Sequence, residues 1–375
     1  MKIVYNILGT FNSGGMERVL ANKANYFVAQ GLEVAIVTTD QQGRSPYFPL
    51  NEAIQLHDLD INYTENNQHG LWKKIISYQR KQKQHKQLLT SLLQDLKADI
   101  VISMFDNDAS FLYRIQDGSK KVLEIHFSRF KRLQYGRKGL WKIIDRLRSW
   151  QDVSIAKRYD RFVVLTEEDK QYWGNLPNIV VIPNANSFVP NCQADVKAKR
   201  AIAVGRYDYQ KGFDELIALW RKIYEQKPDW KLDIFGHGPL KNKLQSQINQ
   251  LGLADVIRLC SPVWDIEKEY CQSGLLVMTS RYEGLPMTLL EAQTYGLPMV
   301  AYACKCGPRD IIRDGENGFL VEEHNQEMMV ARLIQLMENE NLRWEMGRKA
   351  KEMSTDFTEA KVMRKWLDLF NQLTP

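Results

Sequence analysis

The sequence lacks the features that mark several large classes of protein. No run of about 18 apolar residues occurs in it, so we expect no transmembrane helix. Residues 1–9 contain no signal-peptide hydrophobic region or cleavage site and are typical of a first β-strand. The five cysteines are odd in number and scattered along the chain, which favours reduced thiols and a cytoplasmic protein.

Motifs for common cofactors are also missing. The chain has no G-x-G-x-x-G dinucleotide fingerprint and no G-x-x-x-x-G-K phosphate loop. Cys304 and Cys306 are neighbours in sequence, but no second pair of Cys or His residues accompanies them, so we expect no zinc site. These absences argue against a nicotinamide enzyme, a P-loop nucleotide hydrolase and a zinc-binding module.

Length and composition are those of a globular protein with two domains. The 375 residues fit two domains of about 180 residues each. Apolar residues make up 44% and charged residues 26% of the chain, which is enough to build a sizeable core. The net charge of +6 is uneven: residues 1–185 carry 26 Lys/Arg against 19 Asp/Glu, or +7, and the remainder carries 25 against 26, or −1.

The positive charge gathers in residues 120–161. This stretch holds 13 basic and 4 acidic residues, with Phe127, Tyr135, Trp141 and Trp150 among its aromatic side chains. Such a mixture predicts peripheral contact with an anionic membrane or an anionic acceptor. The alternative is an amphipathic surface helix whose basic face is solvated. No nucleic-acid motif accompanies the stretch, so we expect no nucleic-acid partner.

Both halves alternate short apolar strands with amphipathic helices, which predicts an α/β fold with two parallel sheets. The Pro/Asn-rich stretch 182–198 separates the halves. In the first half the expected strands are 2–8, 33–39, 99–105, 121–126 and 161–166, and the helices are 16–29, 71–96 and 139–158. In the second half the strands are 200–204, 231–235, 256–259, 274–279, 298–302 and 318–321, and the helices are 213–226, 239–251, 264–272, 287–295, 308–313 and 325–339.

Two carboxylates eight positions apart follow the apolar strand at 274–279. Glu283 stands in a Gly/Pro loop, and Glu291 lies inside the helix that begins near Met287. Pro286 suits the start of a helix, where its missing N–H costs nothing. Gly296 suits the left-handed backbone conformation that often ends an α-helix. The free amides of the helix start form an anion site between the two carboxylates. A nucleotide sugar needs these three elements, because it presents sugar hydroxyls, a diphosphate and a ribose.

A second loop, Gly205 to Phe213, follows another strand and carries two cations. Arg206 and Lys211 are five residues apart in a loop that ends at a helix start. An Arg supplies a planar fork and a Lys a point charge, so the pair can bind a diphosphate. In open α/β sheets ligands bind beyond the carboxyl ends of the strands, where both loops are expected.

Together these segments resemble the retaining glycosyltransferases of family 4, the group 1 transferases of the GT-B fold. Glu283-x7-Glu291 is similar to that family's Glu-x7-Glu motif, and Gly205-Arg206-x4-Lys211-Gly212 to its Gly-Arg-x4-Lys-Gly element. The sequence around 306–312 resembles a form found in bacterial members that build surface polysaccharides. The resemblance implies two Rossmann-like domains facing across a cleft. The acceptor-binding domain would span residues 1–185, and the nucleotide-sugar-binding domain residues 186–355. A C-terminal helix at 356–375 would return to the first domain.

The resemblance also implies roles for particular residues. Glu283 would bind sugar hydroxyls, Glu291 the ribose, and Arg206 with Lys211 the diphosphate. His126 at a strand end would lie near the transferred sugar, although a structural histidine is the alternative. The expected catalytic residues are Glu283, His126, Arg206 and Lys211. The expected residues for the nucleotide sugar are Gly15, Arg206, Lys211, Gly284, Leu285, Met287, Thr288 and Glu291.

The function implied is transfer of a hexose from a nucleoside diphosphate sugar, UDP-sugar favoured, to a glycan or lipid-linked oligosaccharide acceptor. Metal-dependent transferases of the GT-A fold carry an Asp-x-Asp motif at a strand end; we expect none here, and no metal or other cofactor. Lipopolysaccharide or capsule synthesis would place the enzyme at the inner face of the cytoplasmic membrane. Two alternatives stay open: a sugar phosphorylase or epimerase on the same fold, and an inactive glycan-binding partner subunit.

Overall fold

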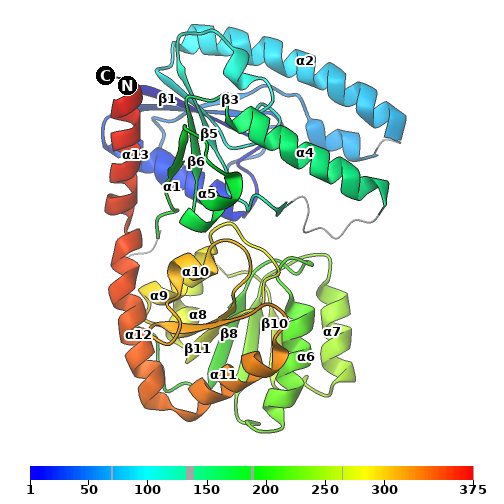
Figure 1. Cartoon of the computed structure of the whole chain (residues 1–375), viewed down its shortest axis with the longest axis vertical. Coiled ribbons are helices and arrows are strands. Elements are labelled where there is room, and N and C mark those ends of the chain that lie inside the picture. Colours follow the sequence, from blue (N-terminus) through cyan, green and yellow to red (C-terminus); the bar gives the residue numbers. More distant parts are fainter. Residues whose placement is uncertain (69–70, 132–138, 187–189, 264, 375) are drawn as a thin grey trace. The chain divides into compact units, whose positions relative to one another are not determined.

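The computed structural model describes residues 1–68, 71–131, 139–186, 190–263 and 265–374. The chain forms two compact units (Figure 1). The first unit contains Met1–Leu165, Lys170–Pro183 and Ala360–Pro375, and the second contains Thr166–Asp169 and Asn184–Glu359. Each unit is built on its own parallel sheet, as the alternation of strands and helices predicts.

The first unit has a seven-stranded sheet in the order β3-β2-β1-β4-β5-β6-β7, and every pair is parallel. β1 and β2 are paired from Lys2 with Glu33 to Ile7 with Thr38. Buried β-branched and aliphatic residues dominate the central strands, which is expected where helices cover both faces. The strands are β1 (Lys2–Ile7), β2 (Glu33–Thr38), β3 (Gln55–Asp58), β4 (Ile100–Ser103), β5 (Lys120–Glu124), β6 (Arg161–Val164) and β7 (Ile179–Val181).

Helices cover the two faces of this sheet. One core contains Leu89 and Leu93 of α2 and Ala156 of α4, packed on the strands. On the other face, Phe27 of α1 stacks edge to face with Phe370 of α13, with 5.3 Å between ring centroids. The chain therefore returns to the first unit at its C-terminal end (Figure 1). The helices are α1 (Gly15–Ala29), α2 (Leu71–Leu96), α4 (Leu140–Ala156), α5 (Glu167–Trp173) and α13 (Glu359–Leu373), with short 3-10 helices at Tyr63–Gln68 and Leu112–Arg114.

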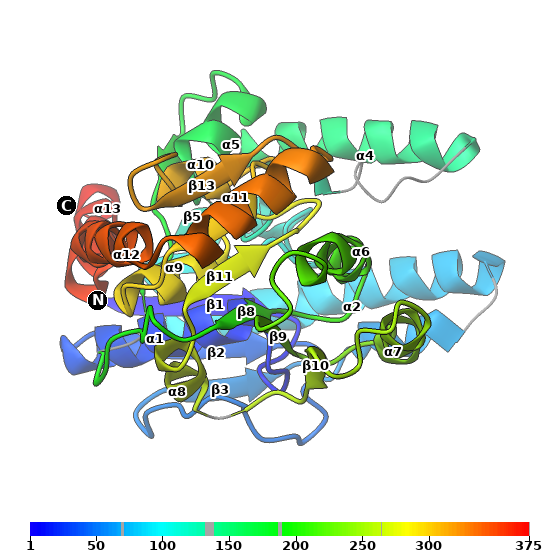
Figure 2. The same ribbon diagram turned by 90° about the horizontal axis from the view of Figure 1, so that it is seen from below.

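The second unit has a six-stranded parallel sheet in the order β10-β9-β8-β11-β12-β13. Helices α6, α7 and α11 pack on one face around buried Trp220 and Trp230, and α8, α9 and α12 lie on the other (Figure 2). Its strands are β8 (Arg200–Val204), β9 (Lys231–Phe235), β10 (Ile257–Cys260), β11 (Leu275–Met278), β12 (Met299–Tyr302) and β13 (Gly318–Val321). Its helices are α6 (Phe213–Tyr224), α7 (Lys241–Gln250), α8 (Ile266–Cys271), α9 (Met287–Thr294), α10 (Pro308–Ile311), α11 (Gln326–Glu338) and α12 (Glu340–Ser354), followed by a 3-10 turn at Thr355–Phe357.

The predicted GT-B fold is confirmed, and its elements agree with the sequence pattern to within a few residues. Besides the short 3-10 helices, four elements were missed: β3, β7, α5, which has only seven residues, and α12. β3 is polar and mostly exposed, β7 has only three residues, and neither therefore carries a long apolar run. Helix α12 follows α11 after a single residue, Asn339, whose side chain accepts a hydrogen bond from Leu342 N–H.

The expectation that all cysteines are reduced is wrong for two of them. Cys192 and Cys271 form a disulfide with a Cα–Cα distance of 6.2 Å, 79 residues apart in sequence. Sequence spacing could not reveal this pair, because the fold alone brings the segment after the domain boundary against α8. Cys260, Cys304 and Cys306 take part in no disulfide. Within the described ranges, no helix is both long and apolar enough to cross a bilayer.

Candidate nucleotide-sugar site

The loop from β8 to α6 is held tightly against the loop after β11. Gly212 has φ 65°, and a Cβ there would lie 2.2 Å from the carbonyl oxygen of Thr279. Only glycine fits such a left-handed position at such close range. The Thr279 hydroxyl donates back to the Gly212 carbonyl at 3.1 Å, and Arg281 N–H donates to Gln210 O at 2.8 Å. The two loops that carry the predicted cations and Glu283 are therefore fixed to each other.

Lys211 and Glu283 meet at this junction. Lys211 Nζ lies 2.7 Å from Glu283 Oε1, and the two side chains are 18% and 7% exposed. Gln210 Nε2 donates to Tyr282 O at 3.0 Å and approaches the other Glu283 oxygen at 3.4 Å. These neighbours orient the Glu283 carboxylate. The Lys211 ammonium group can contact both this carboxylate and an anion bound beside it.

Arg206, the second predicted cation, has a different environment. Its side chain is 71% exposed, and its Nε lies 3.3 Å from Asp208 Oδ2. An exposed ion pair of this kind contributes little to stability. The guanidinium therefore remains available for a phosphate, whereas the Lys211 ammonium is already committed to a half-buried pair.

Helix α9 begins beside Glu283, as predicted. Pro286 occupies the N-cap position, one residue before the first helical turn, and the first intrahelical bond runs from Leu289 N to Pro286 O. The amides of Met287 and Thr288 precede that bond and point out of the helix start. Gly307, with φ 97°, packs against this start, since a Cβ there would lie 2.4 Å from Pro286 Cδ. The helix ends before Gly296, which has φ 70°.

Glu291 is buried in α9 and is held by a residue that the sequence did not single out. Tyr270 of α8 donates its hydroxyl proton to Glu291 Oε2 at 2.7 Å. The Tyr270 ring is stacked on Tyr295, with centroids 5.6 Å apart and an interplanar angle of 19°. No sequence pattern links these residues, because Tyr270 approaches Glu291 only through the packing of α8 on α9.

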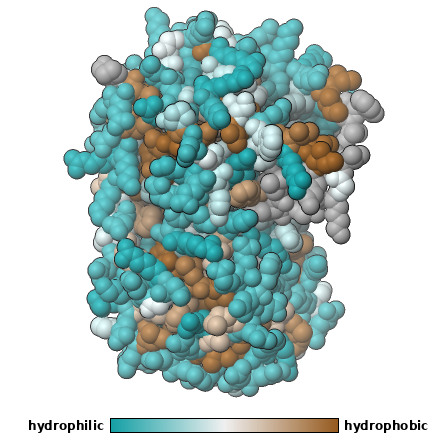
Figure 3. Space-filling view, in the orientation of Figure 1, coloured by the Kyte–Doolittle hydropathy of each residue, from teal (hydrophilic) through white to brown (hydrophobic). Residues whose placement is uncertain are grey.

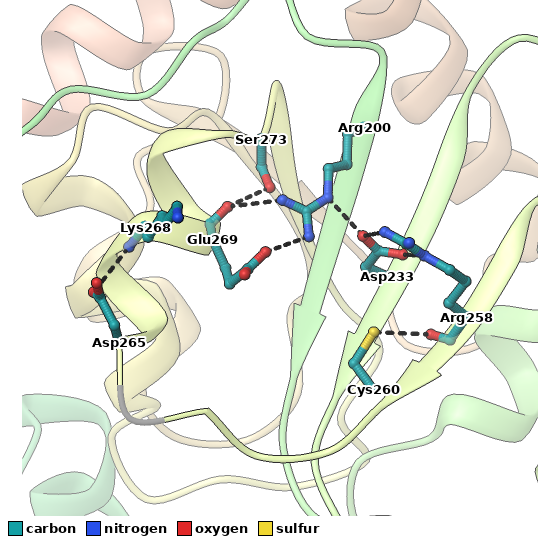
Figure 4. Close-up of polar contacts among 8 residues, drawn as sticks. All are labelled: Arg200, Asp233, Arg258, Cys260, Asp265, Lys268, Glu269 and Ser273. Atoms are coloured by element: carbon teal, nitrogen blue, oxygen red, sulfur yellow. Dashed lines mark hydrogen bonds and ion pairs between the residues drawn. The ribbon is translucent and has the colours of Figure 1, made fainter.

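Ion pairs fix α8 to the sheet. Arg200 of β8 contacts Glu269 of α8 at 2.5 Å and Asp233 of β9 at 2.6 Å, and Arg258 of β10 shares Asp233 at 2.7 Å (Figure 4). Burial alone would raise the pKa of Asp233, but the two guanidinium groups lower it below its usual value. The pairs tie α8 to three strands and so hold Tyr270, the next residue, against Glu291.

In the first unit, Gly15, one of the residues expected to bind the nucleotide sugar, is the first residue of α1. Gly14 is the N-cap of α1, and a Cβ on Gly15 would meet no atom within 4 Å. Packing within the unit therefore does not require glycine at position 15, which leaves room for a ligand to approach the backbone. Glu17, in the first turn of α1, has a raised pKa because it is buried, although its hydrogen bond with Asn12 opposes the shift.

His126 follows β5 and lies in a buried charged cluster. His126 Nε2 is 2.9 Å from Glu124 Oε1, and Lys23 Nζ of α1 is 2.5 Å from both oxygens of Glu124. Glu124 and His126 are two residues apart in the strand direction, so their side chains share one face. That spacing could have identified Glu124 from the sequence, whereas nothing in the sequence pairs it with Lys23.

The expectation of no Asp-x-Asp motif at a strand end is wrong. Asp106-Asn107-Asp108 follows β4, where Phe105 adopts a left-handed φ of 57°. Asp108 is buried, receives a hydrogen bond from Ser103 at 2.9 Å, and has its pKa raised to about 8 by burial and by Asp106. Among the described residues, no three His, Cys, Asp or Glu side chains are grouped so that they could hold a metal ion.

Comparison with known families supports the geometry. Residues 13–185 match the glycosyltransferase family 4 model, and residues 189–353 match the model for glycosyl transferases group 1. The two matches adjoin and account for most of both units. This chain belongs to the group 1 glycosyltransferases.

Individual relatives agree with this assignment. An uncharacterised glycosyltransferase of Haemophilus influenzae is 29% identical over 371 residues, which cover 97% of this chain and 98% of the relative. The amylovoran biosynthesis glycosyltransferase AmsD of Erwinia amylovora is 38% identical over 222 residues, which cover 56% of this chain and 62% of AmsD. The structure of S. aureus TarM in complex with fondaparinux, alpha-GlcNAc-glycerol and UDP is similar in fold, with a TM-score of 0.80, 19% identity and 99% of each chain covered.

Proposed function

We propose that this chain is a retaining, metal-independent hexosyltransferase that uses a UDP-sugar and acts in the synthesis of a cell-surface polysaccharide. The observation that carries the proposal is the arrangement of the second unit. Lys211 and Glu283 form a pair at the loop that leads into α9, and Glu291 stands one turn inside that helix. A cation, free helix amides and two carboxylates match the diphosphate, the hexose and the ribose of a nucleotide sugar.

The roles follow from this arrangement. Lys211 and Arg206 neutralise the diphosphate as the glycosidic bond breaks, aided by the amides of Gly284, Leu285, Met287 and Thr288. Glu283 binds hydroxyl groups of the hexose, and Glu291 binds the ribose. Because cations and a helix start supply the charge stabilisation, the proposal requires no metal ion. His126 of the first unit is assigned to the reacting sugar from the family resemblance.

The acceptor is proposed to be a glycan or a lipid-linked oligosaccharide. Relatives support this choice, since AmsD acts in amylovoran biosynthesis and a full-length relative from Campylobacter jejuni elongates a glycan on undecaprenyl diphosphate. A lipid-linked acceptor would place the enzyme in the cytoplasm, at the inner face of the membrane.

Two helices of the first unit support such membrane contact. Ile143, Leu147 and Trp150 lie at helical spacing on α4 and are 57%, 61% and 77% exposed, and Ile75 and Ile76 of α2 are 46% and 67% exposed. Hydrophobic side chains are visible toward the projecting ends of both helices (Figure 3). Arg146 and Arg148 are exposed between the apolar residues of α4. Of the basic residues in the stretch 120–161, Arg132, Arg137 and Lys138 lie outside the described residues.

The membrane proposal predicts salt-sensitive binding to anionic vesicles. Full burial of an apolar side chain contributes about 1.5–3 kcal/mol, and each Lys or Arg near an anionic surface contributes about 1 kcal/mol. Replacing Leu147 and Trp150 by Gln should therefore reduce vesicle binding at least tenfold. Trp344 of α12, 54% exposed in the second unit, offers the matched control. Equal binding of wild type and the double variant to vesicles in a flotation assay would contradict the proposal.

The catalytic proposal is tested by the anomeric outcome. The protein should release UDP from a UDP-hexose in the presence of a glycan or lipid-linked acceptor, and NMR of the product should show the anomeric configuration of the substrate. Inversion at the anomeric carbon would contradict the retaining assignment. Phosphate-dependent release of a sugar 1-phosphate without any nucleotide would instead identify a phosphorylase.

A further inference from the structure

The buried cluster around His126 contains a lysine whose position is unusual. Lys23 lies on α1 with its side chain only 2% exposed. Its ammonium group is 4.3 Å from the centroid of the Trp366 ring of α13 and 5.3 Å from that of Tyr5 of β1. A lysine is almost never fully buried unless it is paired. Its only ion-pair partner among the described residues is Glu124, which it contacts through both oxygens.

The Glu124 carboxylate therefore lies against both the Lys23 ammonium group and the His126 imidazole, which is a cation only when protonated. Burial by itself would raise its pKa, but Lys23 and His126 lower the pKa of Glu124 to about 2. Glu124 stays ionised throughout the working pH range. Its oxygen lies 2.9 Å from His126 Nε2, although the ring N–H is not aligned with it. The charge of Glu124, more than a well-formed hydrogen bond, is what acts on the imidazole.

We propose that Lys23 is a positioning residue that sets the charge state of His126 through Glu124. Without Lys23, Glu124 would face the imidazole as an uncompensated buried carboxylate and would favour the imidazolium. With Lys23 present, the Glu124 carboxylate is already balanced by the ammonium group and acts less strongly on the imidazole. The inference rests on the proposed function, which assigns His126 to the reacting sugar, where an imidazole can accept a proton or a hydrogen bond from a hydroxyl group.

Other charged groups near the ring are weaker influences. Glu17 of α1 has a charge interaction with His126, but burial raises its pKa, and Asn12 is its hydrogen-bond partner. Asp106, after β4, interacts with Glu17, and burial also raises its pKa. Tyr5 of β1 faces Glu124 and is kept neutral by burial. Lys23 is thus the group placed to cancel the Glu124 charge.

The test replaces Lys23 by Met and follows His126 by NMR. The imidazole signals of the six histidines can be assigned by comparison with His126→Gln. We expect the pKa of His126 to rise by one unit or more in Lys23→Met. The acid limb of the pH profile of transfer should move to higher pH by the same amount. The affinity for UDP should stay within about twofold of wild type, because the nucleotide is bound by the second unit.

A double variant separates charge balance from simple loss of structure. Lys23→Met/Glu124→Gln removes both charges, and replacement of a whole buried ion pair is often well tolerated. The pKa of His126 should return to within a few tenths of the wild-type value. Lys121, paired with Asp117 at the other end of β5 and 4% exposed, provides a matched control. Lys121→Met removes a buried lysine roughly 16 Å along the strand from His126 and should not shift the histidine pKa.

The outcomes are distinguishable. An unshifted His126 titration and an unshifted acid limb in folded Lys23→Met would overturn the inference, while UDP binding and transfer by wild type would leave the proposed function standing. A wild-type protein that neither binds UDP nor transfers sugar would overturn the proposed function itself. If Lys121→Met shifts the His126 pKa as much as Lys23→Met does, the effect is general destabilisation, and the inference fails.

Discussion

Removing the two predicted phosphate cations one at a time should give two different results. Lys211 forms a half-buried pair with Glu283, whose side chain is 7% exposed, whereas Arg206 is 71% exposed. Lys211→Ala leaves Glu283 without its cation, and breaking a well-buried pair costs about 3–5 kcal/mol. Because Lys211 is 18% exposed and water can reach the pair, we expect about 2 kcal/mol. Arg206→Ala should cost less than about 0.5 kcal/mol.

These free energies translate into melting temperatures. For a domain of about 150–250 residues, 1 kcal/mol corresponds to roughly 2–4 °C, so Lys211→Ala should lower the Tm of the second unit by about 4–8 °C. Arg206→Ala should leave it within about 2 °C. Both variants should bind UDP about ten- to a hundredfold more weakly by calorimetry, since each loses a charge-assisted contact worth roughly 1.5–3 kcal/mol.

A paired substitution makes this prediction stricter. Lys211→Met/Glu283→Gln removes both charges and should recover most of the lost Tm, but it should not recover UDP affinity. Unchanged UDP affinity in both single variants would refute the phosphate assignment. A larger loss of Tm in Arg206→Ala than in Lys211→Ala would refute the reasoning from burial.

Three further predictions concern the same site. Glu283→Gln should reduce turnover more than UDP affinity, while Glu291→Gln should weaken UDP about tenfold because it alters the ribose contact; the opposite pattern in calorimetry and kinetics would mean that the two roles are exchanged. Tyr270→Phe removes the hydrogen bond to Glu291 and should weaken UDP binding about threefold to tenfold. The control Tyr302→Phe loses a 2.7 Å hydrogen bond to Glu215 in the same unit and should leave UDP affinity unchanged. Equal effects of the two variants would mean that Tyr270 does not support the ribose contact. Transfer should survive EDTA, and loss of activity that manganese or magnesium restores would contradict the proposed metal independence.

The sequence predicted the elements of the fold well because both sheets are parallel and buried. Strands such as β4 and β11 are continuous apolar runs, and the helices between them carry clear amphipathic patterns. β3 was missed because it lies at the sheet edge and is polar. The return of α13 to the first unit was known only from the family resemblance, since nothing local pairs Phe370 with Phe27.

The candidate site was predicted less completely than the fold. Glu283, Glu291, Arg206 and Lys211 could be selected as candidates from the sequence because they lie in loops, or in the helix that follows one, with recognisable spacing. Their supporting contacts could not be predicted, because these contacts join segments that are distant in sequence. Tyr270 of α8 contacts Glu291 of α9, and the Cys192–Cys271 disulfide joins residues 79 positions apart. The unequal environments of Arg206 and Lys211 also required the structure, since both appear as loop cations in the sequence.

The central claim is that the second unit binds a nucleoside diphosphate sugar through Lys211, Glu283 and Glu291. Thermal unfolding in the presence of UDP, GDP and a series of their sugars tests it most directly. A ligand at 100 times its Kd adds about 2.7 kcal/mol, which corresponds to roughly 5–11 °C for a domain of this size. We predict such a shift with UDP and at least one UDP-hexose. No shift with any nucleoside diphosphate or nucleotide sugar would contradict it.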